Sequence, residues 1–207
     1  MVNAYETIKK IRDYADKNNV PIMLDDGISF LMDYITKNHV KKVLEIGTAI
    51  GYSAIMMALS SEEVFITSIE KDEKRYLEAL KNIKSLNLED RITLIYKDAL
   101  EVEINDFYDL IFIDAAKAQN IKFFEKFSKN LNSNGSIITD NLNFHGLTEV
   151  DEQTIESKNV RSLVRKIKNY VEYLKENSDY QTQFLDIGDG LSITKKKFEF
   201  AEDEVII

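Results

Sequence analysis

Short runs of β-branched and apolar residues alternate with longer amphipathic stretches along most of the chain. Short apolar runs bounded by turn-forming residues predict strands, and apolar residues that recur every three or four positions predict helices. The pattern predicts strands over residues 40–46, 64–70, 91–96, 108–114, 136–140, 180–187 and 191–195. It predicts helices over residues 3–18, 24–38, 51–60, 72–86, 117–130 and 159–176.

Alternation of strand and helix is typical of an open α/β fold with a mostly parallel sheet and helices on both faces. The last two strands are separated only by Gly188, Asp189 and Gly190, too few residues for a crossover, so they are expected to form an antiparallel hairpin. We therefore expect a seven-stranded sheet in one domain over residues 1–207. Residues 1–39 would form a helical cover, residues 40–196 the α/β core and residues 197–207 a tail.

Composition narrows the class of protein. Hydrophobic residues make up 44% of the chain and charged residues 30%, which is ordinary for a globular domain. No apolar run approaches the roughly 20 residues that span a bilayer, and the N-terminus lacks the apolar core of a signal peptide. A cytoplasmic protein without membrane contact is therefore expected. Because the chain has no cysteine, any metal must be held by oxygen or nitrogen ligands.

The connection after the first predicted strand carries two glycines, in the sequence Glu45-Ile-Gly47-Thr-Ala-Ile-Gly51. Ligands of α/β sheets bind beyond the carboxyl ends of the strands, and glycines there allow a tight turn and a close approach of the ligand. Ala49 and Tyr52 break the G-x-G-x-x-G dinucleotide fingerprint, which disfavours an NAD-dependent dehydrogenase. Glu45 beside the turn suits a ligand that carries an ammonium group.

Two further carboxylates follow neighbouring strands. Glu70 ends the second strand, 23 residues after Gly47, where it can accept hydrogen bonds from ribose hydroxyls. Asp98 and the amide of Ala99 follow the third strand, where they can bind the edge of an adenine. Each carboxylate alone is equally well explained as a solvated loop residue. Together with the glycine turn, they resemble the S-adenosylmethionine site of class I methyltransferases.

The fourth and fifth predicted strands also end in oxygen ligands. Asp114 ends the fourth, and Asp140 and Asn141 end the fifth. If these strands are neighbours they lie about 4.8 Å apart, so the three side chains converge at one edge of the sheet. Oxygen ligation completed by water suits Mg²⁺. The alternative is that Asp140 and Asn141 only form a turn, which both residue types favour.

Lys117 follows Asp114 where the next predicted helix begins. A cation at that end of a helix is unfavourable with the helix dipole, although surface lysines do occur at helix starts. Beside a metal and a substrate, a lysine in its neutral form can act as a general base.

The motifs Glu-x-Gly-Thr-x-x-Gly-Tyr-Ser, Asp-Ala-x-Lys and Asp-Asn together resemble the metal-dependent catechol and caffeoyl-CoA O-methyltransferases. The likeness covers nearly the whole chain and includes Pro21-Ile-Met23-Leu-Asp-Asp-Gly27, which is similar to the segment that passes over the cofactor. It implies a Rossmann-like class I methyltransferase, S-adenosylmethionine, Mg²⁺ and a homodimer. The cofactor contacts that it implies are Met23, Ser53, Glu70, Asp98, Ala99 and Asp114, in addition to Glu45 and Gly47 from the glycine turn. The implied metal ligands are Asp114, Asp140 and Asn141, and the implied base is Lys117.

Two positions depart from the family pattern. Many members have an aspartate where Ala116 stands and a tyrosine where Asn120 stands. Both positions lie on the substrate side, so they put a small phenol substrate in question and leave the cofactor and metal assignments intact. The long connection over residues 141–157 is expected to form a substrate loop. Within it, His145 is expected to contact the substrate.

The last predicted helix combines an apolar face with a basic stripe that includes Arg161, Arg165 and Lys168. From Lys158 to Lys175 there are six basic residues and one acid, although the whole chain has a net charge of −9. That net charge opposes attraction to nucleic acid, so binding would depend on a local patch. The stripe is either a solvated helix face or a phosphate-binding ridge beside the active site.

The stripe, the loop Asp-Asn-x-x-Phe-His-Gly and Asn159-Val-Arg161 together resemble the bacterial tRNA 5-hydroxyuridine methyltransferases of the same family. We therefore expect methylation of 5-hydroxyuridine at the wobble position of the tRNA anticodon loop, giving 5-methoxyuridine. The vicinal 5-hydroxyl and 4-carbonyl oxygens can chelate one metal, as those of a catechol do. The alternative is a small-molecule O-methyltransferase of the catechol or caffeoyl-CoA type. A non-enzymatic module would have no need of Asp114, Asp140, Asn141 and Lys117 together.

Overall fold

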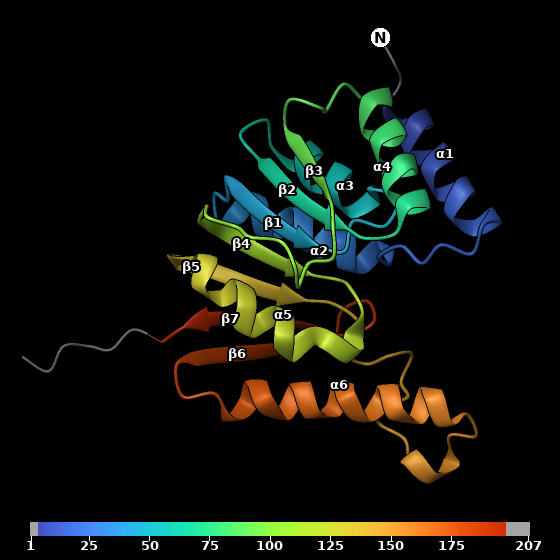
Figure 1. Ribbon diagram of the computed structural model, residues 1–207, viewed down its shortest axis with the longest axis vertical. Coiled ribbons are helices and arrows are strands. Elements are labelled where there is room, and N and C mark those ends of the chain that lie inside the picture. The colour runs from blue at the N-terminus through green and yellow to red at the C-terminus, as the bar shows by residue number, and fades with distance from the viewer. Residues whose placement is uncertain (1–3, 198–207) are drawn as a thin grey trace, which may run out of the picture.

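The computed structural model describes residues 4–197, which build one seven-stranded sheet with helices on both faces (Figure 1). The strands are β1 (Lys42–Ile46), β2 (Phe65–Glu70), β3 (Ile92–Tyr96), β4 (Tyr108–Ile113), β5 (Leu131–Thr139), β6 (Tyr180–Leu185) and β7 (Leu191–Lys196). Their order across the sheet is β3-β2-β1-β4-β5-β7-β6. Apart from Lys197, the predicted tail lies outside the described residues.

Strands β1 to β5 run parallel, whereas β7 pairs antiparallel with both β5 and β6. This confirms the predicted α/β fold with a parallel core and a C-terminal hairpin. Since the five parallel strands point the same way, the connections that follow them collect along one edge of the sheet. The predicted site residues in those connections are Gly47, Asp98, Ala99, Asp114, Lys117, Asp140, Asn141 and His145, and Glu70 ends β2 at the same edge.

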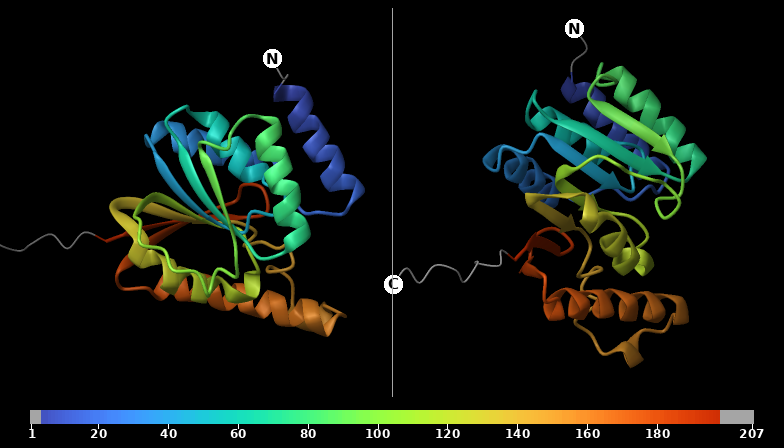
Figure 2. Two further views of the ribbon diagram at one scale, coloured as in Figure 1. Left: turned by 45° about the horizontal axis from the view of Figure 1, so that its top comes forward. Right: turned by 60° about the vertical axis from the view of Figure 1, so that its left-hand side comes forward.

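Six α-helices cover the sheet, with α1 and α6 on opposite sides (Figure 2). They are α1 (Ala4–Lys17), α2 (Asp25–Lys37), α3 (Tyr52–Ser60), α4 (Glu73–Ser85), α5 (Asn120–Phe127) and α6 (Lys158–Glu176). Asp72 caps α4 by accepting the Arg75 amide at 2.9 Å, and Ser157 caps α6 by accepting the Val160 amide at 3.4 Å. Within the described residues, none of the helices has the length and apolar character needed to cross a bilayer.

Both faces of the parallel strands are buried. Side chains alternate between the faces, so Val43 joins the core beneath α1 to α4 and the next residue, Leu44, joins the core beneath α5 and α6. On β4, Phe112 and Ile113 divide in the same way. Burial on both faces explains why these strands are continuous apolar runs in the sequence. It also fixes the register of each strand, because a slip of one residue would reverse which face every side chain meets.

Two predicted elements need correction. Strand β5 begins at Leu131, five residues before the predicted start at Ser136, and its pairing with β4 is irregular between Tyr108 and Leu110. The intervening polar residues looked like a loop in the sequence, yet the amide of Asn132 donates to Asp109 Oδ1 at 2.7 Å and keeps them on the sheet. The predicted helix over residues 117–130 is α5 flanked by two 3-10 turns, Lys117–Gln119 and Ser128–Asn130.

Candidate functional site

A cavity of about 430 Å³ opens along the edge where the parallel strands end. Its wall is formed by the connections after β1 to β5, by the segment that precedes α2 and by the turn between β6 and β7. The predicted site residues on the wall are Met23, Gly47, Glu70, Asp98, Ala99, Asp114, Lys117, Asp140, Asn141 and His145. The predicted site residues that do not line it are Glu45, Ser53, Arg161, Arg165 and Lys168.

Gly47 brings the turn after β1 against the end of β4. Its φ of +100° lies in the region that glycine adopts without strain, and a Cβ at this position would lie 2.3 Å from the carbonyl oxygen of Asp114. Any side chain would therefore force the two connections apart. The glycine turn and Asp114 form one continuous part of the cavity wall.

The carboxylate of Glu70 holds two connections together at the cavity. Its Oε2 accepts the amide of Ala49 at 2.8 Å, and its Oε1 accepts the amides of Lys71 and Asp72 at 2.9 and 2.8 Å. A carboxylate offers about four lone-pair sites, so capacity for a ligand hydroxyl remains. Glu70 is thus a rigid acceptor on the wall, where the sequence predicted a ribose contact.

Glu45 lies behind the wall, which corrects its predicted contact with a ligand ammonium group. The residue is fully buried, and its carboxylate accepts hydrogen bonds from the hydroxyls of Ser53, at 2.5 Å, and Ser68. Ser53 is buried by the same contact, so its side chain also points away from the cavity. Burial raises the pKa of Glu45 to about 7, with further increases from the charges of Asp114 and Glu70.

We expect Glu45→Gln to stabilise the protein above neutral pH. A carboxyl group whose pKa is about 7 when folded and 4.5 when unfolded keeps its proton in the folded state between those values, so the wild-type free energy of unfolding falls as the pH rises through that window. The variant lacks this loss, and its advantage over wild type should grow by up to about 3 kcal/mol between pH 5 and pH 8. Urea unfolding at both pH values measures it, with the exposed Glu89→Gln as control. An advantage that does not change with pH would contradict the assignment.

Asp98 occupies the far end of the cavity. Its carboxylate accepts the amide of Leu100 at 2.9 Å and pairs with the ammonium group of Lys71 at 3.2 Å. The backbone hydrogen bond from Leu100 and the neighbouring Lys71 lower the pKa of Asp98, so this carboxylate stays ionised. Ala99 is buried beside it. The pair offers a fixed acceptor next to a backbone amide.

Lys117 and Asp114 form a close ion pair on the opposite part of the wall. The Nζ atom of Lys117 donates to Asp114 Oδ1 at 2.6 Å, and the two side chains are 14% and 22% exposed. Lys117 opens the 3-10 turn Lys117–Gln119, which places it three residues after the strand end. The contact is that of an ammonium with a carboxylate, and it fixes the two side chains against each other on the wall.

Asp140, Asn141 and Asp189 meet beside this ion pair. Asp140 is 3% exposed, and burial together with the charge of Asp114 raises its pKa to about 7, while Lys117 acts in the opposite direction. The side-chain amide of Asn141 donates to Asp189 Oδ2 at 3.3 Å, which leaves the Asn141 carbonyl oxygen available as an acceptor. Three carboxylates and one ammonium therefore share this corner, an arrangement that favours a cation.

Asp189 also holds the loop that carries His145. Its Oδ1 accepts the backbone amide of His145 at 2.6 Å. Asn141, Phe144 and His145 all have positive φ values, of 61°, 45° and 56°, a conformation that is strained for residues other than glycine. The His145 side chain is 77% exposed at the cavity mouth. The buried carboxylate of Asp189 thus fixes a strained loop next to the cavity.

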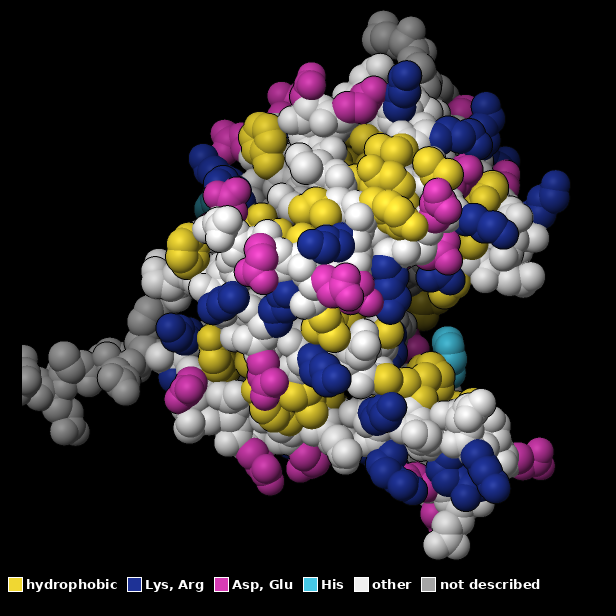
Figure 3. All heavy atoms as spheres, in the orientation of Figure 1, with side chains coloured by type: hydrophobic (Ala, Val, Ile, Leu, Met, Phe, Trp, Pro, Cys, Tyr) yellow, Lys and Arg dark blue, Asp and Glu magenta, His cyan; other side chains and the backbone are white. Residues whose placement is uncertain are grey.

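The basic stripe of α6 lies outside the cavity. Figure 3 shows Lys and Arg side chains gathered over the start of α6 and the segment beside it. The guanidinium group of Arg161 donates to the carbonyl oxygen of Ile155, that of Arg165 donates to Glu152, and Lys168 lies 3.9 Å from Glu152. These residues can therefore touch only a ligand that extends beyond the cavity.

The cover of the cavity is fastened by a residue that the sequence did not single out. Arg12 on α1 pairs with Asp25 at 2.6 Å, and it also donates to the Tyr52 hydroxyl at 3.3 Å. Asp25 begins α2, directly after the cavity-lining residues Met23 and Leu24. The ion pair lowers the pKa of Asp25 and fixes the start of α2.

Comparison with known proteins assigns the family. The O-methyltransferase family model matches residues 2–197. The chain belongs to the O-methyltransferase family. A caffeoyl-CoA O-methyltransferase of Populus kitakamiensis is 28% identical, with 93% of this chain and 87% of that protein covered. A Staphylococcus aureus structure described as a candidate caffeoyl-CoA O-methyltransferase is 40% identical, with a TM-score of 0.87 and 92% of both chains covered.

A Bacillus cereus O-methyltransferase, solved in complex with SAH, is 26% identical and has a TM-score of 0.79, with 93% of this chain and 91% of that chain covered. Our protein is thus an S-adenosylmethionine-dependent O-methyltransferase. This confirms the predicted enzyme class and cofactor. The volume of the cavity is within the range of about 300–1,000 Å³ that is usual for small-molecule sites.

The O-methyltransferase site contains polar residues that sequence reasoning missed. Asp189 is the most important, because it contacts the loop of Asn141 and His145 from 48 and 44 residues away. The glycines on either side of it were the available signal, and they were interpreted only as a hairpin turn. Gln119 also lines the cavity, two residues after Lys117. Contacts over such separations leave no local pattern in a sequence.

Proposed function

We propose that this O-methyltransferase methylates the 5-hydroxyl of 5-hydroxyuridine at the wobble position of tRNA and thereby produces 5-methoxyuridine. The observation that carries the proposal is the basic stripe of Arg161, Arg165 and Lys168 on α6, next to the loop that lines the cavity. A small phenol would not reach these residues, whereas the phosphates of an RNA loop would. Ala116 departs from the family pattern and lines the cavity, which agrees with a different substrate, whereas Asn120 is buried and does not line it.

We further propose that Mg²⁺ assists the reaction. Asp114, Asp140 and the carbonyl oxygen of Asn141 are hard oxygen donors that would hold it, and the pKa of Asp140 is raised first by burial and then by the negative charge of Asp114, which such an ion would offset. Among the described residues, no cluster of three His, Cys, Asp or Glu side chains fit for metal binding is found, and the proposed set depends on the asparagine. A bound Mg²⁺ would make a hydroxyl group at this position more acidic.

Lys117 removes the proton of the substrate hydroxyl in this proposal. Its neutral amine accepts the proton, and the contact with Asp114 then holds the resulting ammonium, at the 2.6 Å separation of the ion pair. The hydroxyl oxygen forms a bond to the methyl carbon while the bond from that carbon to the cofactor sulfur breaks.

A wobble base suits a cavity at the surface of this fold. The anticodon loop is single-stranded, so turning its base outward costs little. His145 and Phe144 line the mouth of the cavity, and their rings, 5.6 Å apart, offer a surface on which a base can stack. The 5-hydroxyl and the 4-carbonyl oxygen are adjacent, so both can face the oxygen ligands at Asp140.

The second candidate is a small-molecule O-methyltransferase of the caffeoyl-CoA type. The descriptions of the Populus and Staphylococcus relatives favour it. We also propose that the protein forms a homodimer, as the family resemblance suggests, and that it lies in the cytoplasm, as the composition suggests. Sedimentation analysis measures the oligomeric state directly.

The two substrates are separated by variants of the stripe. Arg165→Ala should raise the KM for tRNA several-fold and leave the turnover of a free catechol or nucleoside unchanged, because those ligands do not reach α6. It should also reduce the dependence of log affinity on log salt by somewhat under one unit. Lys166→Ala, with the same charge change at an exposed position off the stripe, is the matched control. Equal behaviour of the two variants, or tRNA binding that ignores salt, would favour the small-molecule alternative.

A further inference from the structure

The connection before α6 binds all three cations of the basic stripe. Arg161 donates to the carbonyl oxygen of Ile155 at 2.7 and 3.2 Å. Arg165 donates to Glu152 Oε2 through two nitrogens, both at 3.2 Å. Lys168 lies 3.5 Å from the carbonyl oxygen of Val150 and 3.9 Å from Glu152 Oε1. One six-residue segment, residues 150–155, thus occupies the surface that would otherwise face a phosphate chain.

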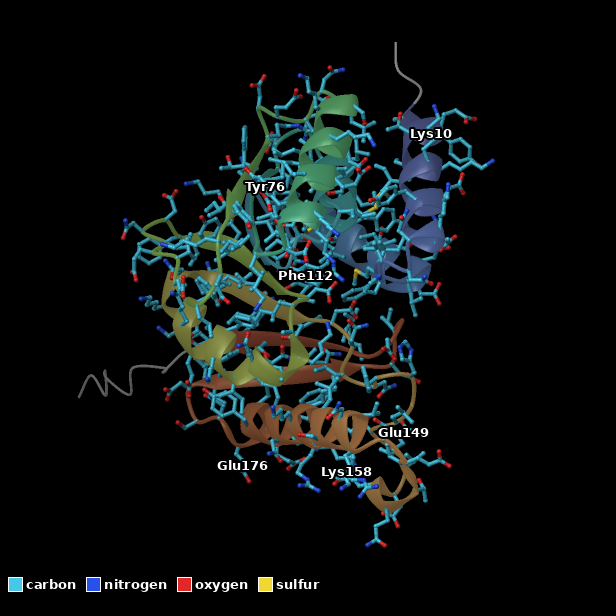
Figure 4. The ribbon with its side chains drawn as sticks, turned by 45° about the vertical axis from the view of Figure 1, so that its right-hand side comes forward. Lys10, Tyr76, Phe112, Glu149, Lys158 and Glu176 are labelled. Atoms are coloured by element: carbon cyan, nitrogen blue, oxygen red, sulfur yellow. The ribbon has the colours of Figure 1, made fainter. Side chains whose placement is uncertain are left out.

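The segment presents acceptor oxygens to the cations of the stripe, as a phosphate chain would. Glu152 offers a carboxylate to Arg165 and Lys168, and the backbone of residues 150–155 offers carbonyl oxygens to the other donors. The connection is acidic along its length, with Glu149, Asp151 and Glu156 all exposed. In Figure 4, Glu149 and Lys158 lie near one another at the start of α6, and Glu176 marks the opposite end of the helix. The acidic segment therefore lies over the basic stripe of α6.

The ion pair formed by Glu152 is one that a phosphate can replace. Both nitrogens of Arg165 contact the same carboxylate oxygen, so the two parallel bonds of a bidentate pair are absent here. The Arg165 side chain is 63% exposed, and exposed pairs of this kind are weak and screened by salt. A phosphate group carries a comparable charge and offers more acceptor oxygens to a guanidinium group.

The part of the connection nearer the cavity is held separately. Leu142 and Asn143 donate their amides to Gly190 and Asp189 at 2.9 and 2.8 Å, and Thr148 donates back to Asn143 at 3.3 Å. Residues 141–148 are therefore fastened to the β6–β7 turn, whereas residues 150–154 are exposed or half-buried and contact the stripe, and the buried Ile155 anchors the end of the segment. Residues 150–154 can therefore move away from α6 while Ile155, Asp140 and Asn141 stay in place.

We propose that residues 150–155 act as an internal competitor for phosphate: Glu152 occupies Arg165 and Lys168 in the free enzyme, and the RNA backbone displaces it on binding. This inference rests on the proposed tRNA substrate. It explains how an enzyme of net charge −9 keeps Arg165 and Lys168 paired until a polyanion with the right spacing arrives. An RNA that reaches only one cation would not displace the segment, so the competition favours a ligand that contacts the whole stripe.

The test compares Glu152→Gln with Glu156→Gln, which removes the same charge from an exposed neighbour that makes no ion pair with the stripe within the described part of the chain. The probe is an unmodified tRNA transcript, whose affinity is measured by fluorescence anisotropy at two salt concentrations. Glu152→Gln should bind about two- to fivefold more tightly than wild type, the factor expected for losing an exposed ion pair. Glu156→Gln should show a clearly smaller gain. The gain from Glu152→Gln should fall to that of the control when Arg165→Ala is also present.

Equal gains in tRNA affinity from Glu152→Gln and Glu156→Gln would overturn the proposal that residues 150–155 compete with phosphate, because the effect would then be one of net charge alone. A gain that persists without Arg165 would overturn it as well. Mass spectrometry of tRNA that carries 5-hydroxyuridine, after incubation with wild-type enzyme, S-adenosylmethionine and Mg²⁺, tests the substrate separately. If the tRNA is methylated but the two variants gain affinity equally, the competitor role of residues 150–155 is rejected and the tRNA substrate is kept. If only Glu152→Gln gains affinity and no methylation occurs, the competitor role is kept and the substrate is rejected.

Discussion

Lys117→Ala is expected to lower kcat by about 10² to 10⁴, the usual contribution of a positioned proton acceptor. The reason is that we propose the amine next to Asp114 as the group that takes the proton from the substrate hydroxyl, and alanine would leave that proton without an acceptor. Raising the pH should restore part of the rate, since the hydroxyl then ionises in solution. Steady-state kinetics from pH 6 to pH 10 give both results.

The control for this experiment is Lys122→Ala, which removes an exposed lysine from α5 and should leave the rate unchanged. The affinity for S-adenosylhomocysteine, measured by calorimetry, should be similar in all three proteins because Lys117 is not assigned to the cofactor. A Lys117→Ala enzyme that works at the wild-type rate at neutral pH would mean that the base is elsewhere.

Removing a proposed metal ligand should have an effect of similar size. Asp140→Asn is expected to lower turnover by at least about a hundredfold, since the Mg²⁺ that we propose it helps to hold would supply several kcal/mol of charge stabilisation. The same loss should follow treatment of the wild type with EDTA and should be reversed by added Mg²⁺. Asn141→Ala is expected to act in the same direction, while cofactor affinity changes much less.

A measurement of stability shows whether the Asp140→Asn variant loses activity because a ligand is missing or because the protein unfolds. Burial raises the pKa of Asp140 to about 7, so the ionised carboxylate is unfavourable in the folded protein above that pH and the neutral asparagine removes the cost. The Asp140→Asn variant should therefore be inactive and yet at least as stable as wild type at pH 8, which thermal unfolding measures. Full activity in EDTA, or an Asp140→Asn variant that turns over normally, would contradict the metal-assisted reaction.

Much of the fold could be predicted because its pattern is local. Strand and helix alternate, and parallel strands must end at one edge, so Glu70, Asp98, Asp114 and Asp140 could be placed near one another before any coordinates were known. The start of β5 could not, because its polar residues resemble a loop and are held on the sheet by a contact between Asn132 and Asp109, 23 positions apart.

The direction of single side chains was harder to predict. Glu45 lies one residue before the end of β1. Because side chains alternate between the two faces of a strand, its carboxylate faces α3, where it contacts Ser53, eight residues later in the chain. The spacing could have shown this, but a carboxylate before a glycine turn was interpreted as a ligand contact. The charge and the helical face of Arg161 and Arg165 could be predicted from the sequence. Their partners, Ile155 and Glu152, could not, because they depend on how the connection folds back.

The central claim is that this O-methyltransferase modifies 5-hydroxyuridine in tRNA. The most direct measurement is nucleoside mass spectrometry of tRNA that carries 5-hydroxyuridine, after incubation with the purified enzyme, S-adenosylmethionine and Mg²⁺. The account predicts that 5-hydroxyuridine disappears as 5-methoxyuridine forms, and that the conversion fails with the Lys117→Ala and Asp140→Asn variants. Unchanged 5-hydroxyuridine, together with rapid methylation of a catechol by the same preparation, would contradict it.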